Sequence, residues 1–374
     1  MIPSGDNDLR VLVLAPYPLD RAPSQRFRWE QYVQPLGARG IRLEPSSFLD
    51  SQGMDLVHLQ GRWPTKASAI AGGLRRRLTD MVAARRYDLV LVHRESLPVG
   101  PAWVERTLRR LGVPYAFDFD DAIFLPAASE ANRRFAWLKG ARKTEVAVRG
   151  ASRVLAGNRY LADWAQKFTP RVTVVPTTID TDAYRATERS NERPICIGWS
   201  GSPTTIAHLK LFEPVLREIQ RDRGVDLRVI GDRSYSLPGA RVEALEWSAA
   251  TEIADLQRLD IGVMPLPDDE WSRGKCGLKA LQYMALGIPT VLSPVGVNRE
   301  IARDGAAILA DGEVEWLQAL RRLIDDPALR SSVGEAGRVR VERAYSVNAT
   351  LPLWEDVLRD AARRRRRLHS TTIA

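Results

Sequence analysis

The feature that most constrains this fold is a regular alternation of short apolar runs with longer amphipathic stretches. Runs rich in Val, Leu and Ile are typical of strands buried on both faces of a parallel sheet, and amphipathic stretches between them are typical of the covering helices. The predicted strands are residues 10–15, 55–59, 88–93, 115–119, 153–156, 171–176, 194–199, 226–231, 260–265, 289–293 and 306–309. The predicted helices are residues 25–36, 67–86, 101–111, 130–149, 205–222, 250–259, 278–286 and 314–325, with one or two more within 346–368.

The pattern restarts after a polar stretch at residues 176–193, which we interpret as a linker between two domains. A chain of 374 residues is long enough for about two domains of ordinary size. We therefore predict two tandem Rossmann-like, doubly wound α/β domains at residues 1–180 and 181–345. A C-terminal helix and basic tail at 346–374 is expected to return to the first domain. Ligands bind at the carboxyl ends of such strands, so we expect the active site in the cleft between the domains.

Composition excludes several classes of protein. The chain is 44% hydrophobic and 27% charged, which is ordinary for a globular protein, and no apolar run approaches the ~20 residues that span a bilayer. Residues 1–8 lack the apolar core of a signal peptide. The two cysteines, Cys196 and Cys276, provide neither a disulfide framework nor a metal-ligand cluster. We therefore expect a cytoplasmic protein.

The net charge of +9 comes from the first half of the chain, and the five arginines 363–367 offset an acidic second half. A basic face is typical of proteins that bind nucleic acid, anionic membrane or phosphorylated ligands. A solvated surface from an arginine-rich genome is the alternative. We expect no nucleic-acid partner, because no binding motif of that class occurs.

The segment at residues 271–300, WSRGKCGLKALQYMALGIPTVLSPVGVNRE, is the most informative. It predicts a loop that leads into a helix at about Leu278, which ends at Gly287 and Pro289. The unpaired N–H groups at a helix start bind anions, whereas lysines there oppose the helix dipole. Lys275 and Lys279 therefore favour an anion bound between them, although two solvated lysines are the alternative.

This segment resembles the C-terminal signature of GT-B glycosyltransferases, in particular the retaining enzymes of family 4. Similar likenesses occur in ASRVLAGNRYLADW, RVTVVPTTIDTDAY, ICIGWSGSPTTIAHLKLFEPVLREI, LRVIGD and LDIGVMPL, so the resemblance covers residues 10–360. It implies a GT-B fold in which the second domain binds a nucleotide-sugar donor and the first binds the acceptor. It also implies that no metal or other cofactor is needed.

The chain departs from that signature at both of its glutamates. The first falls on Gly274 and the second on Gln282, whose amide oxygen can still accept a hydrogen bond from the donor ribose. The family's phosphate-binding Arg and Lys near the first strand of the second domain are also missing. The residues we expect to bind the donor instead are Gly201, Ser202, Asp232, Trp247, Arg273, Lys275, Lys279 and Gln282. Asp268, Asp269 and Glu270 are candidates for the missing carboxylate.

The first domain contains no GxGxxG and no P-loop. Arg26 and Arg28 follow the first strand, where we expect them to bind a diphosphate or an acceptor phosphate. The alternative for both is one basic face of an amphipathic helix.

Three carboxylates, Asp118, Asp120 and Asp121, end the strand of FDFDDAIF. The family often has a histidine near the sugar at this strand end, so we predict Asp118 and Asp120 as catalytic, together with Lys275 and Lys279. Structural caps of the following loop are the alternative. His93 and Arg94 end the preceding strand, and with Asp121 they are expected on the acceptor side.

The predicted function is a glycosyltransferase that moves a hexose from a nucleotide sugar to an acceptor, with retention if it follows the family. Fixed positive charge on the departing diphosphate is its expected means of catalysis. The basic first domain and tail favour a glycan or lipid-linked acceptor in polysaccharide or glycolipid synthesis and a peripheral position on an anionic membrane. Because both motif glutamates are replaced, a GT-B module that binds without turnover is the alternative. A hydrolase or epimerase of the same fold and a nucleic-acid-binding protein are weaker alternatives.

Overall fold

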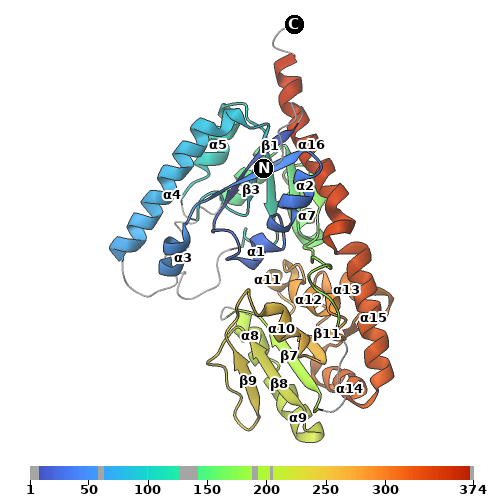
Figure 1. Cartoon of the computed structure of the whole chain (residues 1–374). Coiled ribbons are helices and arrows are strands. Elements are labelled where there is room, and N and C mark those ends of the chain that lie inside the picture. The colour runs from blue at the N-terminus through green and yellow to red at the C-terminus, as the bar shows by residue number, and fades with distance from the viewer. Residues whose placement is uncertain are drawn as a thin grey trace. The chain divides into compact units, whose positions relative to one another are not determined.

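The computed structural model describes residues 8–57, 63–98, 100–125, 142–187, 193–202 and 205–370. The chain divides into two compact units (Figure 1). The first unit comprises Met1–Pro176 and Thr350–Ala374, and the second comprises Thr177–Ala349. The last helix therefore crosses from the second unit into the first.

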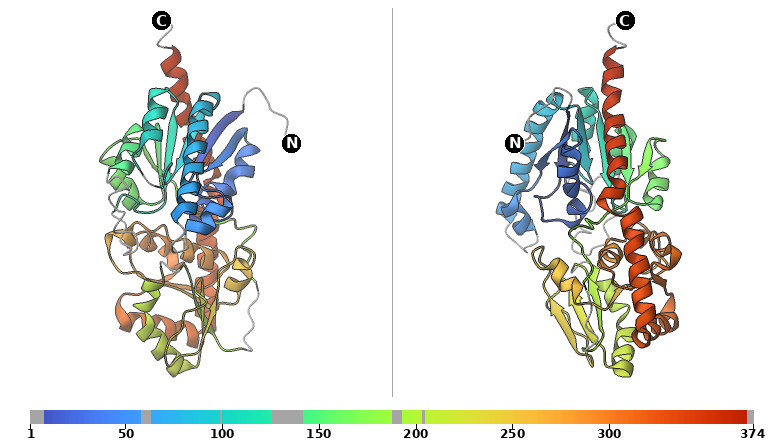
Figure 2. Two further views of the ribbon diagram at one scale, coloured as in Figure 1. Left: turned by 90° about the vertical axis from the view of Figure 1, so that its left-hand side faces the viewer. Right: turned by 45° about the vertical axis from the view of Figure 1, so that its right-hand side comes forward.

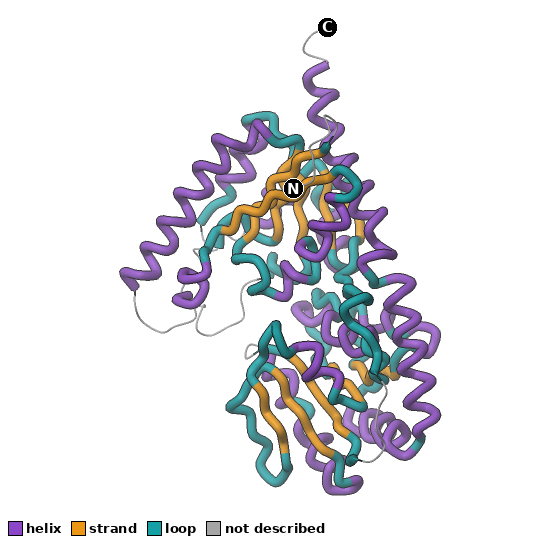
Figure 3. The backbone as a smooth tube through the Cα atoms, viewed as in Figure 1, coloured by secondary structure: helices purple, strands orange, loops and turns teal. Residues whose placement is uncertain are grey.

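The first unit contains a six-stranded parallel sheet in the order β2-β1-β3-β4-β5-β6. Its strands are β1 (Leu9–Ala15), β2 (Ile41–Ser47), β3 (Leu89–His93), β4 (Tyr115–Phe119), β5 (Arg153–Ala156) and β6 (Val172–Val174). Its helices are α1 (Pro23–Arg26), η1 (Glu30–Tyr32), α2 (Val33–Gly37), α3 (Ser51–Val57), α4 (Trp63–Ala83), η2 (Ala84–Arg86), α5 (Trp103–Arg110), α6 (Lys143–Gly150) and α7 (Arg159–Gln166). Helices α4 and α5 lie on one side of this sheet, and α2 and α7 lie on the other (Figures 1 and 3).

The second unit repeats this architecture with the strand order β12-β11-β10-β7-β8-β9, again parallel throughout. Its strands are β7 (Cys196–Ser200), β8 (Asp226–Ile230), β9 (Val242–Leu245), β10 (Ile261–Met264), β11 (Thr290–Leu292) and β12 (Ile308–Leu309). Its helices are α8 (Ile206–Lys210), α9 (Glu213–Arg223), α10 (Glu252–Gln257), α11 (Glu270–Arg273), α12 (Leu278–Ala285), α13 (Asn298–Ile301), η5 (Arg303–Gly305), α14 (Gly312–Asp325) and α15 (Pro327–Ala344).

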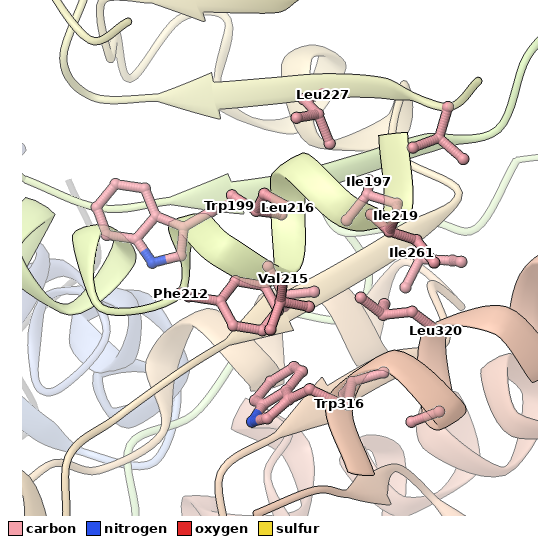
Figure 4. Packing of buried hydrophobic residues seen from close by; sticks show 14 of the residues in the cluster. Ile197, Trp199, Phe212, Val215, Leu216, Ile219, Leu227, Ile261, Trp316 and Leu320 are labelled. Carbon is pink, nitrogen blue, oxygen red and sulfur yellow. The ribbon is translucent and has the colours of Figure 1, made fainter. Parts of the chain in front are cut away.

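The core of the second unit lies between its sheet and helices α9 and α14. Trp199 and Ile197 of β7 contact Phe212, Leu216 and neighbouring side chains (Figure 4). Phe212 in turn packs edge-on against Trp316 of α14, with ring centroids 4.4 Å apart. Side chains alternate between the two faces of a strand, so the odd-numbered residues of β7 face this core.

The opposite face of the same sheet is covered at very close range. A Cβ on Gly262 of β10 would lie 2.4 Å from the ring of Tyr283, and one on Gly198 would lie 2.1 Å from Leu259. Only glycine allows α12 to approach the strands so closely. This packing brings the start of α12 to the carboxyl end of β7.

The final helix, α16 (Val347–Ser370), belongs to the first unit from Thr350 onward and has buried side chains there as far as Ala362 (Figure 2). Trp354 is fully buried there, and its ring centroid lies 5.1 Å from that of Tyr32. The hydroxyls of Tyr32 and Thr350 share a hydrogen bond of 2.5 Å. These contacts confirm the predicted return of the C-terminal helix to the first domain.

Most of the predicted strands and both parallel sheets are confirmed, with three exceptions. The predicted strand at 55–59 is wrong, because Asp55–Val57 ends α3, and residues 58–59 lie outside the described residues. The strands β2 and β9 were not predicted. Both are edge strands whose sequences mix charged and apolar residues, so they lack the continuous apolar run of a central strand.

The helix predictions differ mainly where proline or a turn interrupts the chain. The predicted helix at 25–36 is α1, η1 and α2, and the one at 205–222 is α8 and α9, with Pro214 in the first turn of α9. Residues 130–141 of the predicted helix at 130–149 lie outside the described residues, and α15 was not predicted. Within the described residues, no helix is long and apolar enough to cross a membrane.

Candidate functional site

Each sheet has one point where the strand order reverses, between β1 and β3 in the first unit and between β7 and β10 in the second. Ligands of doubly wound sheets bind outside the carboxyl ends of the strands at such a point. Most of the predicted site residues lie near one of these two places. The two groups of residues belong to different units.

In the second unit, Lys279 lies in the first turn of α12, at the carboxyl end of β7. Its ammonium lies 4.2 Å from the centroid of the Trp199 ring and donates a weak hydrogen bond of 3.4 Å to Thr205 Oγ1. In the part of the chain that the structure describes, no carboxylate forms an ion pair with Lys279. Lys275 lies beside the ring of Trp271, with Nζ 4.7 Å from its centroid.

The electrostatics around Lys279 and Lys275 favour a bound anion. Burial, followed by the charge of Lys275, lowers the pKa of Lys279 to about 7. The pKa of His208 on α8 is also lowered, by burial and by the charges of Lys279 and Lys275. Bound negative charge would offset both effects, because an opposite charge within a few ångströms favours the charged form of a lysine.

The loop after β7 approaches the backbone of β8 more closely than any side chain would allow. Gly231 has φ +119°, and a Cβ there would lie 1.8 Å from the carbonyl oxygen of Gly201. The Gly201 amide donates to the carbonyl of Ile230, while Ser202 N donates to Thr205 Oγ1 at 3.0 Å. The backbone N–H groups of Gly201 and Ser202, which we expected to bind the donor, therefore already donate to protein acceptors.

Gln282 belongs to a buried hydrogen-bond chain. Its amide nitrogen donates to the Tyr184 hydroxyl at 3.0 Å, and that hydroxyl donates to Glu252 at 2.8 Å. The other oxygen of Glu252 accepts from the indole of Trp247, also at 2.8 Å. The chain joins Gln282 to Trp247, two of the predicted donor-binding residues. Tyr184 and Glu252 were missed, because nothing in the sequence relates residues so far apart.

The remaining predicted donor residues have other partners. The guanidinium of the exposed Arg273 pairs with Asp268 at 2.7 Å, and Asp269 caps α11 through Ser272 N. Asp232 accepts from Ser234 N and Ser234 Oγ and so stabilises the turn after β8. Asp268 and Asp269 thus have local structural partners, and so does Asp232.

In the first unit, three of the predicted residues form a fully buried network. The Arg28 guanidinium pairs with Asp118 and also donates to the carbonyl oxygen of Val175. His93 Nδ1 lies 2.7 Å from Oδ2 of the same carboxylate. The side chains of Arg28, His93 and Asp118 are all 0% exposed. The sequence predicts Arg28 as a phosphate or acceptor ligand, whereas in the structure its partners are protein groups.

Asp118 is ionised in this network. Burial by itself raises the pKa of Asp118, but the Arg28 guanidinium and the hydrogen bond from His93 together lower it to about 2. The hydrogen bond also orients the imidazole, whose Nε2 is buried and has no hydrogen-bond partner among the described residues. Because Asp118 is fully buried, it suits the positioning of His93 better than direct contact with a substrate.

A second group lies where β3 and β4 end. Arg94 pairs with Asp120 at 3.3 Å and with Asp121 at 3.0 Å, and all three side chains are partly exposed. Burial by itself lowers the pKa of Arg94, but the two carboxylates raise it above its ordinary value. Arg94 has φ +57°, a left-handed conformation that costs energy in a residue other than glycine. Arg26 lies at the end of α1, with its guanidinium carbon 5.0 Å from the centroid of the Phe27 ring.

Comparison with known proteins agrees with the architecture. Residues 195–326 match the family described as Glycosyl transferases group 1, so the second unit contains a domain of that family. The D-inositol 3-phosphate glycosyltransferase of Pseudarthrobacter chlorophenolicus is 34% identical over an alignment of 153 positions, which covers 36% of this chain. The match covers only 35% of that relative's length.

Two solved structures are similar over nearly the whole chain. One is the sucrose-phosphate synthase of Thermosynechococcus elongatus, with a TM-score of 0.65 and 13% identity, covering 97% of this chain and 100% of that one. The other is Anabaena HepE in complex with UDP and glucose, with a TM-score of 0.62 and 13% identity, covering 93% and 99%. The chain therefore has the GT-B fold that its sequence predicts, with a Glycosyl transferases group 1 domain in its second unit.

Replacing Asp118 tests the buried network. Asp118→Asn leaves the Arg28 charge buried without a carboxylate, so we expect a loss of about 3–5 kcal/mol in the free energy of unfolding. Urea denaturation measures this loss. Because Asp118 titrates near pH 2, the difference from the wild type should be the same at pH 5 and pH 8 and should decline only as the pH falls below about 4.

Asp163→Asn is the matched control, since Asp163 is exposed on α7 of the same unit. Its effect should lie within about 0.5 kcal/mol of zero. A loss below about 1 kcal/mol for Asp118→Asn would show that the pair is not the structural ion pair described.

Proposed function

We propose that this protein is a glycosyltransferase that transfers a sugar from a nucleotide-sugar donor to an acceptor. The observation that carries the proposal is Lys279 in a Glycosyl transferases group 1 domain, a half-buried cation that pairs with no carboxylate among the residues that the structure describes. A diphosphate is the ligand that fits a lysine pair at the start of a helix. In support, Anabaena HepE of the same fold binds UDP and UDP-glucose.

Lys275 and Lys279 would act on the leaving group. When the bond between sugar and diphosphate breaks, negative charge accumulates on the phosphate oxygens, and fixed cations in a partly dry site stabilise it. The N–H groups of the first turn of α12 add to this effect, because they have no partner within the helix. No other cofactor is part of the proposal, and the nucleotide sugar is a co-substrate.

The buried chain from Gln282 to Trp247 would recognise the nucleoside. The amide nitrogen of Gln282 is held by Tyr184, which leaves its oxygen to accept from a ribose hydroxyl. Trp247, held by Glu252, follows β9 at the carboxyl edge of the sheet, where an aromatic side chain can contact the base.

In the first unit, the group at the ends of β3 and β4 would bind the acceptor. Arg94, Asp120 and Asp121 offer both donors and acceptors of hydrogen bonds at a partly exposed position. Arg26, at the end of α1 in the same unit, would add a positive charge. His93 and Asp118 are both fully buried, so they would hold the ends of β3 and β4 in position rather than contact the acceptor. We further propose that transfer proceeds with retention of configuration.

A second candidate function is binding of a sugar nucleotide without turnover. Gly274 and Gln282, in place of the two glutamates of the family signature, favour it. Hydrolysis or transfer of a bound nucleotide sugar by the purified chain would exclude this candidate.

We also propose that the protein docks on anionic membranes to reach a lipid-linked acceptor. Arg106, Arg109 and Arg110 of α5 line an open pocket of about 350 Å³ with Arg149 of α6. The three α5 residues form no ion pair with any residue in the described ranges. The arginines 363–367 add further positive charge at the end of α16.

Nucleotide binding tests the leading proposal. We expect one of UDP, GDP, ADP or CDP, and its sugar conjugate, to raise the melting temperature, since a ligand at 100 times its Kd adds about 2.7 kcal/mol of stability. Lys279→Ala should abolish the shift. The control Lys210→Ala removes an exposed lysine of α8 in the same unit and should retain it. No shift with any nucleotide would contradict the proposal.

The pH dependence of donor binding tests the role of Lys279 as a cation. The pKa of Lys279 is lowered to about 7, so above pH 7 the free protein must take up a proton before it binds the diphosphate. Calorimetry should show affinity for the nucleotide sugar falling by up to about tenfold per pH unit from pH 7 to 9. A nucleotide sugar is the right probe, because its diphosphate does not itself titrate in this range.

Lys279→Arg is the matched control, since arginine does not titrate below pH 12. Its affinity should vary little over the same pH range. An equal fall in the wild type and in Lys279→Arg would assign the pH dependence to another group.

Flotation with liposomes tests the membrane proposal. We expect binding to anionic vesicles and none to neutral ones, because each arginine near an anionic surface contributes about 1 kcal/mol. Replacement of Arg106, Arg109 and Arg110 by Gln, or removal of residues 363–374, should weaken binding. No flotation of the wild type with anionic vesicles would contradict it.

A further inference from the structure

A group of arginines in the second unit lies at the amino ends of the strands, whereas Lys279 lies at their carboxyl ends. Arg193, Arg228, Arg241 and Arg258 line an open pocket of about 410 Å³, together with Asp226 and Glu243. We call this the arginine pocket. Asp226 begins β8, and Arg241 directly precedes β9 (Figure 1). Since all strands of the sheet are parallel, the pocket is at their amino ends, about 13 Å along β7 from the loop that leads to Thr205.

Arg228 is the unusual member of this group. Its neighbours in β8, Leu227 and Val229, belong to the hydrophobic core, so Arg228 points to the other face of the sheet. Its side chain is only 3% exposed, and it forms one ion pair, from Nη2 to Glu243. The Nε and Nη1 atoms are buried and have no hydrogen-bond partner among the described residues.

Such an arginine is incompletely satisfied. A guanidinium has five N–H donors, and buried donors in proteins nearly always have acceptors. Glu243 supplies a single short contact and is itself about half exposed, with a second arginine, Arg258, 3.8 Å away. A ligand with several oxygens on one atom matches the planar fork of a guanidinium better than one carboxylate at the rim.

The balance of charge in the arginine pocket also favours an anion. Four guanidinium groups face two lining carboxylates, Asp226 and Glu243. Asp226 pairs with Arg241 at 2.7 Å, and Asp260, which does not line the pocket, pairs with Arg193 at 2.8 Å. Burial raises the pKa of the nearby Cys196 thiol to about 11, although the charge of Arg228 acts in the opposite direction. The thiol is therefore neutral and does not repel an anion.

We propose that the arginine pocket binds a small phosphate-bearing anion, separately from the donor site. Arg228 would form the floor of the site, and Arg193, Arg241 and Arg258 would close over the ligand from the rim. The volume is in the range of small-molecule sites, so a phosphorylated metabolite fits as well as inorganic phosphate or pyrophosphate. This site goes beyond the proposed glycosyltransferase activity and does not depend on it.

The test uses pyrophosphate as the probe and removes the donor site first. In the full-length variant Lys275→Ala with Lys279→Ala, calorimetry at constant ionic strength should still show saturable binding of pyrophosphate, with a Kd below about 1 mM. Adding Arg228→Met should weaken that binding at least about tenfold. Parallel titrations with inorganic phosphate and a sugar phosphate distinguish the free ion from a phosphorylated metabolite.

A rim variant keeps the test valid if Arg228→Met does not fold. Arg241→Gln with Arg258→Gln changes two exposed side chains and should also weaken pyrophosphate binding, while the nucleotide-induced shift of the otherwise wild-type protein stays unchanged. No saturable binding, or equal binding with and without these substitutions, would overturn the proposal. Failure of nucleotides to bind would contradict the glycosyltransferase proposal and leave this one standing.

Discussion

The packing of α12 on the second sheet is the contact on which the candidate donor site depends. Tyr283 rests on Gly262 of β10, and its hydroxyl accepts from the backbone N–H of Ser200 at the end of β7, at 2.7 Å. This hydrogen bond joins the end of β7 to a side chain of α12. It also fixes the first turn of α12 beside the loop after β7, so that Lys279 lies against Trp199. A lysine placed there loses hydration and gains no carboxylate partner from the described part of the chain, so its pKa is lowered.

The two units hold their charges in different ways. In the first unit, the buried charges of Arg28 and Asp118 compensate each other, and the contacts of Arg28 join the turn after α1 to β4 and to the residue that follows β6. In the second unit, two cations are incompletely compensated. Lys279, at the carboxyl ends of the strands, has no carboxylate partner among the described residues. Arg228, near their amino ends, pairs with Glu243 but keeps buried Nε and Nη1 atoms without acceptors in the described ranges. A compensated buried pair serves structure, whereas an uncompensated cation near a pocket favours an anionic ligand. We therefore assign a structural role to the pair of Arg28 with Asp118 and a binding role to Lys279 and Arg228.

The sequence predicts the fold far better than the site. Central strands such as β1 and β3 are continuous apolar runs, and their pattern alone indicates doubly wound sheets. The edge strands β2 and β9 contain charged residues, so the pattern does not predict them. Lys275 and Lys279 stand out in the sequence as candidates because their charge conflicts with a helix start, and their role in binding stays a prediction. The burial of Arg28 is not, since its partner Asp118 is 90 residues away and only folding reveals the pair. The same holds for Tyr184 and Glu252, and for the position of Arg228 in the lining of the arginine pocket.

The most direct test of this account is a crystal structure with the nucleoside diphosphate that stabilises the protein most. The account predicts diphosphate oxygens within hydrogen-bond distance of Lys279 Nζ and of a backbone N–H in the first turn of α12. It also predicts a ribose hydroxyl at the amide oxygen of Gln282. A nucleotide bound elsewhere, with Lys279 still packed on Trp199 and free of phosphate, would contradict the central claim.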